Sequence, residues 1–215
     1  AQDGQLLLRG RVEDGDLLTK VEKKNRLLRL CGARYCCLVE DDAEALHPGW
    51  LSSLVLALGG VNGAALAGPQ EIAFGPPPEA AQQVLSGQVS EVTNLPGFCM
   101  MIDTALGLEF DVRVQTMDDL YLSLLARSRG FRPVKVYGAA LRHTKQPWAP
   151  DGTPPWEQPD RTRYGTGDAY YERDRHQQKR VQEARLLIGQ FGDLARLTLP
   201  PELLAVIEPQ NELDP

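Results

Sequence analysis

The sequence has no long hydrophobic run. A helix that crosses a bilayer needs about 18 consecutive apolar residues, whereas the longest run, residues 51–58, contains serines and ends at Gly59 and Gly60. Residues 2–15 are polar and acidic and do not have the pattern of a signal peptide. We therefore expect no transmembrane segment and a cytoplasmic location, with peripheral attachment to a membrane left open.

Cysteine and basic charge are also scarce. Two of the four cysteines, Cys36 and Cys37, are adjacent inside an apolar run, which indicates buried strand packing rather than a disulfide framework or a zinc site. The formal net charge is −6, which argues against nucleic acid as a partner because nucleic-acid-binding domains usually present a basic face. An acidic protein that binds an anionic ligand needs a metal ion or a local basic pocket to offset repulsion.

The chain alternates between apolar segments and amphipathic ones. Its 215 residues, 42% of them hydrophobic, suit one domain with a sizeable core. We expect strands at 5–9, 35–39, 64–67, 98–102 and 133–137, and helices at 18–31, 50–58, 118–128 and 168–189. This order favours an α/β fold with a mixed, mostly parallel sheet flanked by helices. We divide the chain into a core, residues 1–145, and a C-terminal part, residues 146–215, with a proline-rich loop, a charged helix and a loose tail from Pro200.

Three acids follow the apolar segment at 35–39 without a break: Glu40, Asp41 and Asp42. Ligands in α/β folds bind beyond the carboxyl ends of strands, and hard cations such as Mg²⁺ take carboxylate oxygens together with substrate phosphates. The run is therefore a candidate metal site, and a solvated acidic turn is the alternative.

Asp118 and Asp119 stand at the start of an amphipathic helix. Either residue is a candidate helix cap, and either is a candidate general base, because a carboxylate can accept a proton from an attacking hydroxyl. His143 follows an expected strand and is a candidate metal ligand through a ring nitrogen; a structural role is the alternative. Arg161 and Arg163, in the proline-rich loop, are candidate phosphate contacts, although the segment also suits a surface loop.

Read in order, several segments resemble the nucleotide-diphospho-sugar glycosyltransferases of the GT-A fold. KNR at 24–26, YCCLVEDD at 35–42 and HPGWL at 47–51 resemble most closely the large inverting family, family 2-like, that includes many bacterial polysaccharide enzymes. GFCMMI at 97–102 is similar to the strand under the donor sugar, and DDLYLSLLARSRGF at 118–131 to the helix that carries the catalytic base. VYGAALRH at 136–143 is similar to the closing strand with its histidine.

This resemblance implies a hexosyltransferase-like enzyme of carbohydrate biosynthesis that depends on Mg²⁺ or Mn²⁺. Its donor is a nucleotide-diphospho-sugar and its acceptor a carbohydrate or a lipid-linked molecule. The implied metal ligands are Asp42, Glu40 and His143, and Glu40, Asp41 and Gly97 are implied donor contacts. Asp119, with Asp118 beside it, is the implied base, and attack assisted by Asp119 inverts the anomeric centre.

Several alternatives stay open. Glu40 stands where the family more often has Asp, and Leu125 where the base helix has Arg, so a retaining relative without such a base is one alternative. A non-catalytic remnant of the GT-A fold that binds carbohydrate or a protein partner is another. A nucleotidyltransferase is a third, but the glycine-rich basic loop that binds a triphosphate is not visible. The oligomeric state is undetermined.

The N-terminal part is shorter than the resemblance requires. The family holds its nucleotide base against an opening strand–helix–strand unit, which takes about 30 residues or more, but only 24 residues precede Asn25. We expect that the start of the chain is missing, or that the donor pocket is incomplete or completed by a partner.

Overall fold

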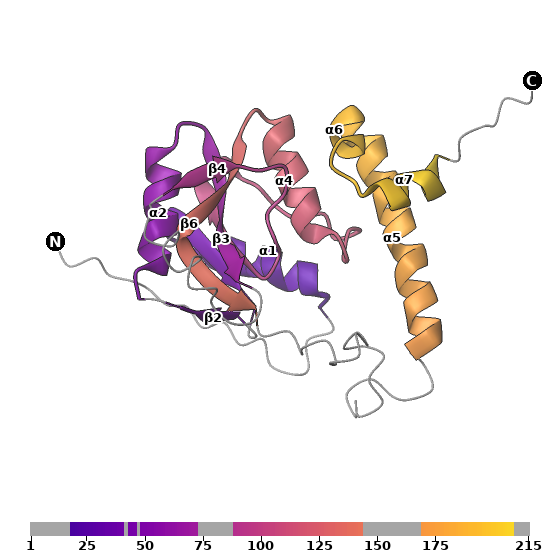
Figure 1. The fold of residues 1–215 in the computed structure, drawn as a ribbon, viewed down its shortest axis with the longest axis horizontal. Coiled ribbons are helices and arrows are strands. Elements are labelled where there is room, and N and C mark those ends of the chain that lie inside the picture. Colours follow the sequence, from indigo (N-terminus) through magenta and orange to yellow (C-terminus); the bar gives the residue numbers. More distant parts are fainter. Residues whose placement is uncertain (1–17, 41–42, 47, 73–87, 144–168, 209–215) are drawn as a thin grey trace, which may run out of the picture.

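A mixed sheet with helices on its faces forms the centre of the computed structural model, and further helices pack beside it (Figure 1). The structure describes residues 18–40, 43–46, 48–72, 88–143 and 169–208; the strand expected at 5–9 lies outside them. The helices are α1 (Lys20–Leu30), α2 (Trp50–Gly60), η1 (Thr104–Leu106), α4 (Asp118–Ser128), α5 (Ala169–Phe191), α6 (Asp193–Arg196) and α7 (Pro201–Ile207). The strands are β1 (Tyr35–Val39), β2 (Ala43–Ala45), β3 (Ala64–Ile72), β4 (Val89–Glu91), β5 (Cys99–Asp103) and β6 (Arg132–His143).

The sheet has the strand order β1-β5-β3-β6-β2, and β4 pairs with β6. Among the described strands only β3 and β6 pair in parallel, while the other pairings are antiparallel. The chain is thus α/β with a mixed sheet, but the expectation of a mostly parallel sheet is wrong for this part of the chain. β1 and β3 do run in the same direction, but β5 lies between them in the opposite direction. Hydrophobic periodicity carries no information on strand direction, so the sequence could not show this.

Helices cover both faces of the sheet. On one face, Leu54 and Leu58 of α2 pack against the strands. On the other face, α1 and α4 contribute buried side chains such as Val21 and Leu122. The alternation of side chains along β5 supplies both clusters, since successive strand residues point to opposite faces and all five residues of β5 are buried.

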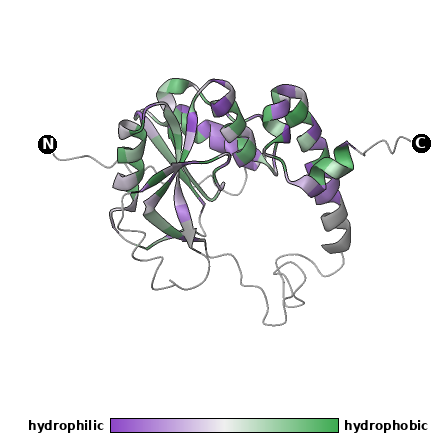
Figure 2. Cartoon of the chain, turned by 45° about the horizontal axis from the view of Figure 1, so that its top comes forward, coloured by the Kyte–Doolittle hydropathy of each residue, from purple (hydrophilic) through white to green (hydrophobic). Residues whose placement is uncertain are grey.

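The C-terminal helices α5, α6 and α7 pack against the side of α4 that faces away from the sheet. The cluster there joins α4 to the three helices through Leu124, Leu187, Ala195 and Leu203. Figure 2 shows that these helices carry both hydrophobic and hydrophilic residues, as expected of helices with one packed side. In the described part of the chain, no helix is long and apolar enough to span a bilayer.

Most of the helices and strands expected from the sequence are confirmed. The elements that were not expected are short, among them the strands β2 and β4 and the helix α7. The segments 35–39 and 118–128 coincide with β1 and α4. Gly130 ends α4 because it takes a left-handed conformation, with φ of 81°. The loose tail expected from Pro200 is wrong for residues 201–207, which form α7 with Pro201 in its first turn. The three-residue strands β2 and β4 were not expected, because so few residues show no period.

The interpretation of Cys36 as a packing residue is confirmed. It is buried among core residues of the sheet, and all four cysteines are free thiols. Burial raises the pKa of the Cys36 thiol to about 12, which keeps it protonated and unreactive.

One glycine on β3 is required by the packing of the loop before β5. Gly68 lies opposite Lys135 in the β3–β6 pairing, and a β-carbon at position 68 would come within 2.8 Å of Leu95 Cδ2. Leu95 is fully buried, so it has little room to move. We expect Gly68→Ala to lower the free energy of unfolding by about 1–3 kcal/mol, the usual cost of an overpacked core, as measured by urea denaturation.

Gly189→Ala is the matched control, because a β-carbon at position 189 meets nothing within 4 Å. This residue lies inside α5, where alanine is more favourable than glycine by up to about 1 kcal/mol. If Gly68→Ala unfolded at the same urea concentration as the wild-type chain, Leu95 would not lie as close to position 68 as the structure shows.

Candidate active site

The carboxyl ends of three strands lie at one edge of the sheet. β1 and β3 each pair antiparallel with β5, and β3 pairs parallel with β6, so β1, β3 and β6 run in the same direction. Glu40 directly follows β1, as expected of the acidic run. In the described part of the chain, Gln70 Oε1 and Arg142 Nε, near the ends of β3 and β6, are buried without a hydrogen-bond partner. Such buried polar atoms are uncommon in folded proteins, and here both lie at the edge where α/β folds bind ligands.

The two acidic stretches meet at this edge. The backbone N–H of Glu40 donates to the carbonyl oxygen of Phe98 at 2.8 Å. The backbone N–H of the preceding residue, Gly97, donates to Oδ2 of Asp119 at 3.1 Å. Two consecutive residues therefore connect the end of β1 to the start of α4, which are far apart in the sequence.

Gly97 permits this close approach because it has no side chain. A β-carbon at position 97 would lie 3.2 Å from the β-carbon of Asp119, which is tighter than ordinary van der Waals contact, and 3.5 Å from its Oδ2. The GT-A resemblance implies that Gly97 contacts the nucleotide-sugar donor. In the structure the N–H of Gly97 donates to the carboxylate of Asp119.

The carboxyl group of Asp119 is largely removed from water. Burial raises its pKa, the N–H of Leu120 opposes this by donating to Oδ1 at 2.8 Å, and the neighbouring charge of Asp118 raises the pKa further. The charges of Lys24 and Lys20 lower it, but the net shift is upward. A raised pKa makes a carboxylate a stronger proton acceptor, as a general base requires.

Lys20 brings a positive charge to the same place. Its ammonium lies 2.6 Å from Glu40 Oε1. Partial burial disfavours the charged ammonium, but the hydrogen bond to Glu40 and the charges of Asp118, Glu40 and Asp119 outweigh this effect, so that the pKa of Lys20 is raised. Acids of both stretches, Glu40 on one side and Asp118 and Asp119 on the other, raise the pKa of Lys20. This is a second indication that the two stretches lie close together.

Asp118 differs from its neighbour Asp119 because it is sealed in an ion pair. Its Oδ2 lies 2.5 Å from the ammonium of Lys24, and the two residues are only 4% and 9% exposed. Lys24 also lies over the ring of Phe110, 5.4 Å from its centroid. This environment suits a residue that fixes the start of α4 rather than one that exchanges protons with a ligand.

Neither aspartate caps α4, contrary to one of the two interpretations of the sequence. The N-cap is Met117, which makes no side-chain capping bond. Glu183 of α5 instead accepts hydrogen bonds from the N–H groups of Gln115, Thr116 and Met117 at 2.8–3.1 Å, and from the hydroxyl of Thr116 at 2.7 Å. Glu183 is 1% exposed. No sequence pattern points to Glu183, because it is one of many charged residues in its helix.

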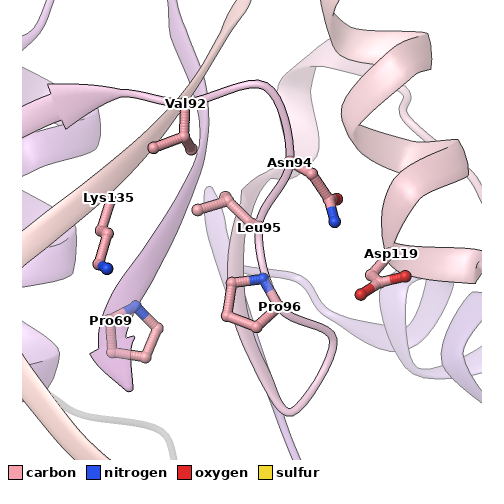
Figure 3. A pocket seen from close by; sticks show the side chains of 7 residues that line it. All are labelled: Pro69, Val92, Asn94, Leu95, Pro96, Asp119 and Lys135. Carbon is pink, nitrogen blue, oxygen red and sulfur yellow. The ribbon is translucent and has the colours of Figure 1, made fainter. Parts of the chain in front are cut away.

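A pocket of about 410 Å³ opens next to Asp119 (Figure 3). Its apolar lining consists of Pro69, Val92, Leu95 and Pro96, and its polar lining of Asn94, Asp119 and Lys135. Sequence reasoning identified only Asp119 among them. Asn94 and Lys135 were missed because they come from a loop and a strand with no motif of their own, and only the fold brings them to the base.

The remaining predicted site residues cannot be placed by their side chains. Asp41, Asp42, Arg161 and Arg163 lie outside the described residues, as does the side chain of His143. The backbone of His143 is opposite Ala43 in the β2–β6 pairing, so it runs beside the residue that follows Asp42. Among the residues that the structure describes, no cluster of three or more His, Cys, Asp or Glu could hold a metal ion.

A scan against protein families finds no match for this chain, and a search of curated proteins finds no significant relative. The chemistry of the site is then the basis for assigning a function. The site combines Asp119, whose carboxyl pKa is raised, with Glu40 at the end of β1 and its partner Lys20. A pocket lined by Lys135 adjoins Asp119. A carboxylate of this kind can accept a proton from a ligand, and the lysines can bind a ligand that is negatively charged.

The contribution of Glu183 to the site can be measured as stability. Glu183→Ala removes the acceptor for three backbone N–H groups and a hydroxyl, and each buried donor left without a partner costs about 1–3 kcal/mol. We expect the variant to lose about 3 kcal/mol or more of unfolding free energy in urea denaturation.

Arg185→Ala, on the exposed side of the same helix, is the control and should change stability by no more than about 0.5 kcal/mol. If Glu183→Ala were as stable as Arg185→Ala, the carboxylate of Glu183 would not be what holds the turn before α4.

Proposed function

We propose that this protein is a glycosyltransferase that moves a sugar from a nucleotide-diphosphate donor to an acceptor hydroxyl, with Asp119 as the general base. The observation that carries the proposal is the convergence of Glu40 and Asp119 through the backbone of Gly97 and Phe98. It joins the acid at a strand end, where a nucleotide diphosphate would bind, to a carboxyl group with a raised pKa. The GT-A resemblance of the sequence requires this proximity.

The proposed reaction is a single displacement. Asp119 accepts the proton of the acceptor hydroxyl, and the oxygen forms a bond to the anomeric carbon of the donor sugar. The bond from that carbon to the diphosphate oxygen breaks, and its electron pair leaves with the diphosphate. Attack from the side opposite the leaving group inverts the anomeric centre. The N–H groups of Gly97 and Leu120 donate hydrogen bonds to the carboxylate of Asp119. These bonds fix the orientation of the carboxylate.

The proposed site of a hard divalent cation is the acidic run that follows β1. Carboxylate oxygens are the ligands that Mg²⁺ and Mn²⁺ prefer, and Glu40 and Asp42 would supply them. The β2–β6 pairing, with Ala43 opposite His143, supports His143 as a further ligand. When bound, the cation would neutralise the negative charge that develops on the leaving diphosphate. Lys20, which already lies against Glu40, adds a positive charge beside it.

The role of Asp119 is tested by replacing its carboxyl group with an amide of the same shape. Asp119→Asn cannot accept the proton, so we expect transfer to fall about 100- to 10,000-fold while donor binding is unchanged. For the wild-type chain, transfer should be lost as the pH falls through the raised pKa of Asp119, because protonation removes the base. The measurement is product formation with UDP-, GDP- and TDP-sugars at a series of pH values.

Asp193→Asn is the control, because Asp193 is an exposed aspartate of α6 whose partner is Arg196. It should transfer sugar at the wild-type rate. Wild-type transfer by Asp119→Asn, with the same pH dependence, would exclude Asp119 as the base.

The metal site is tested separately by Asp42→Ala. Without this carboxylate, we expect binding of a nucleoside diphosphate in the presence of Mn²⁺ to fall to the level seen with a chelator, because the cation that bridges protein and phosphate is lost. Isothermal titration calorimetry with UDP, GDP and TDP measures this, with Asp193→Ala as the control. Undiminished Mn²⁺-dependent binding by Asp42→Ala would show that the metal is held elsewhere.

A further inference from the structure

The pocket beside Asp119 has groups of opposite charge on its two sides. Figure 3 shows Asp119 at the start of α4 on one side and Lys135 of β6 on the other, with Leu95 and Pro96 between them. The side chain of Asn94 lies on the Asp119 side. A ligand in this pocket would therefore meet a carboxylate, an amide, an apolar surface and an ammonium group in turn.

Lys135 is a positively charged residue of the pocket lining. Among the described residues, no carboxylate lies within ion-pair distance of its ammonium, which lies over the ring of Tyr137, 5.4 Å from the ring centroid. Lys20 and Lys24, by contrast, each pair with an acid at 2.6 Å or less. An ammonium that lines a pocket and is not paired with the carboxylate on the other side of that pocket favours an anionic ligand.

We propose that this pocket binds the acceptor, and that the acceptor is a sugar that carries an anionic group, a carboxylate or a phosphate, paired with Lys135. The inference rests on the proposed function, because Asp119 is the base that faces the acceptor hydroxyl. Leu95 and Pro96 contact the apolar face of the sugar ring, and Asn94 hydrogen-bonds its hydroxyls. The volume of about 410 Å³ is at the lower end of the range of about 300–1,000 Å³ for small-molecule sites, which suits a small acceptor unit.

The test measures the binding of simple sugars to the whole chain without any nucleotide-sugar donor present. Binding is monitored by the shifts of amide signals in NMR spectra. Glucose, glucuronate and glucose 6-phosphate serve as the neutral, carboxylate and phosphate probes. We expect at least one charged sugar to bind about tenfold more tightly than glucose. The free energy of a hydrogen bond to a charged group corresponds to a change in the dissociation constant of about this size or more. The shifts should include Asn94 and Lys135, and the preferred charged sugar identifies the anionic group.

Three variants separate the role of Lys135 from general electrostatics. Lys135→Gln should remove the preference for the charged sugar, and Lys135→Arg should keep it. Lys179→Gln makes the same change of net charge at an exposed position of α5 and should also keep it. The amide spectra of each variant report whether it is folded.

The proposal is overturned if glucose binds as tightly as both charged sugars, if Lys135→Gln retains the preference, or if none of the sugars shifts the residues of the pocket. These outcomes are independent of glycosyl transfer. A chain that binds the charged sugar through Lys135 but transfers nothing would support the pocket and contradict the proposed function. A chain that transfers equally well to neutral and charged acceptors would support the function and contradict this inference.

Discussion

A buried ion pair between Lys24 and Asp118 fixes the part of the structure on which the candidate site depends. Removing either charge from water without its partner is costly, so α1 and the first turn of α4 must be placed together. Asn25, the next residue of α1, exchanges two hydrogen bonds of 2.8 Å with the backbone of Phe110, which fixes the segment that leads to α4. Asp119 directly follows the paired aspartate, and its position relative to Gly97 is a consequence of this arrangement.

The start of α4 is held from the C-terminal side as well. Glu183 accepts hydrogen bonds from the turn before α4 and is a buried charged residue of a mostly polar helix. Its neighbour Ala184 and the residue it bonds, Met117, both belong to the hydrophobic cluster of α4 to α7. Residues 169–208 therefore do more than pack beside the sheet, because one of their side chains, Glu183, holds the segment that leads to the proposed base.

Charge is distributed in the site in a way that the net charge of −6 does not reveal. Lys20 and Lys24 lie among Glu40, Asp118 and Asp119 and partly offset the repulsion between these acids. Asp119 has a raised pKa because burial outweighs the attraction of the two lysines. Lys135, on the other side of the pocket, lies apart from them. An acidic protein can therefore present local positive charge to an anionic ligand, as the composition required.

The sequence by itself determined the local elements and the order of the motifs. The helical period and the apolar run gave α4 and β1 with their observed bounds, and the acids at their ends were recognised as candidates for chemistry because such residues suit metals and proton transfer. Only the tertiary structure decided that Asp119 and not Asp118 lines the pocket, that β5 runs antiparallel between β1 and β3, and that Glu183, Asn94 and Lys135 belong near the base. Periodicity reports which side of an element is buried, whereas strand direction, ion pairing and pocket lining arise from contacts between residues far apart in the chain.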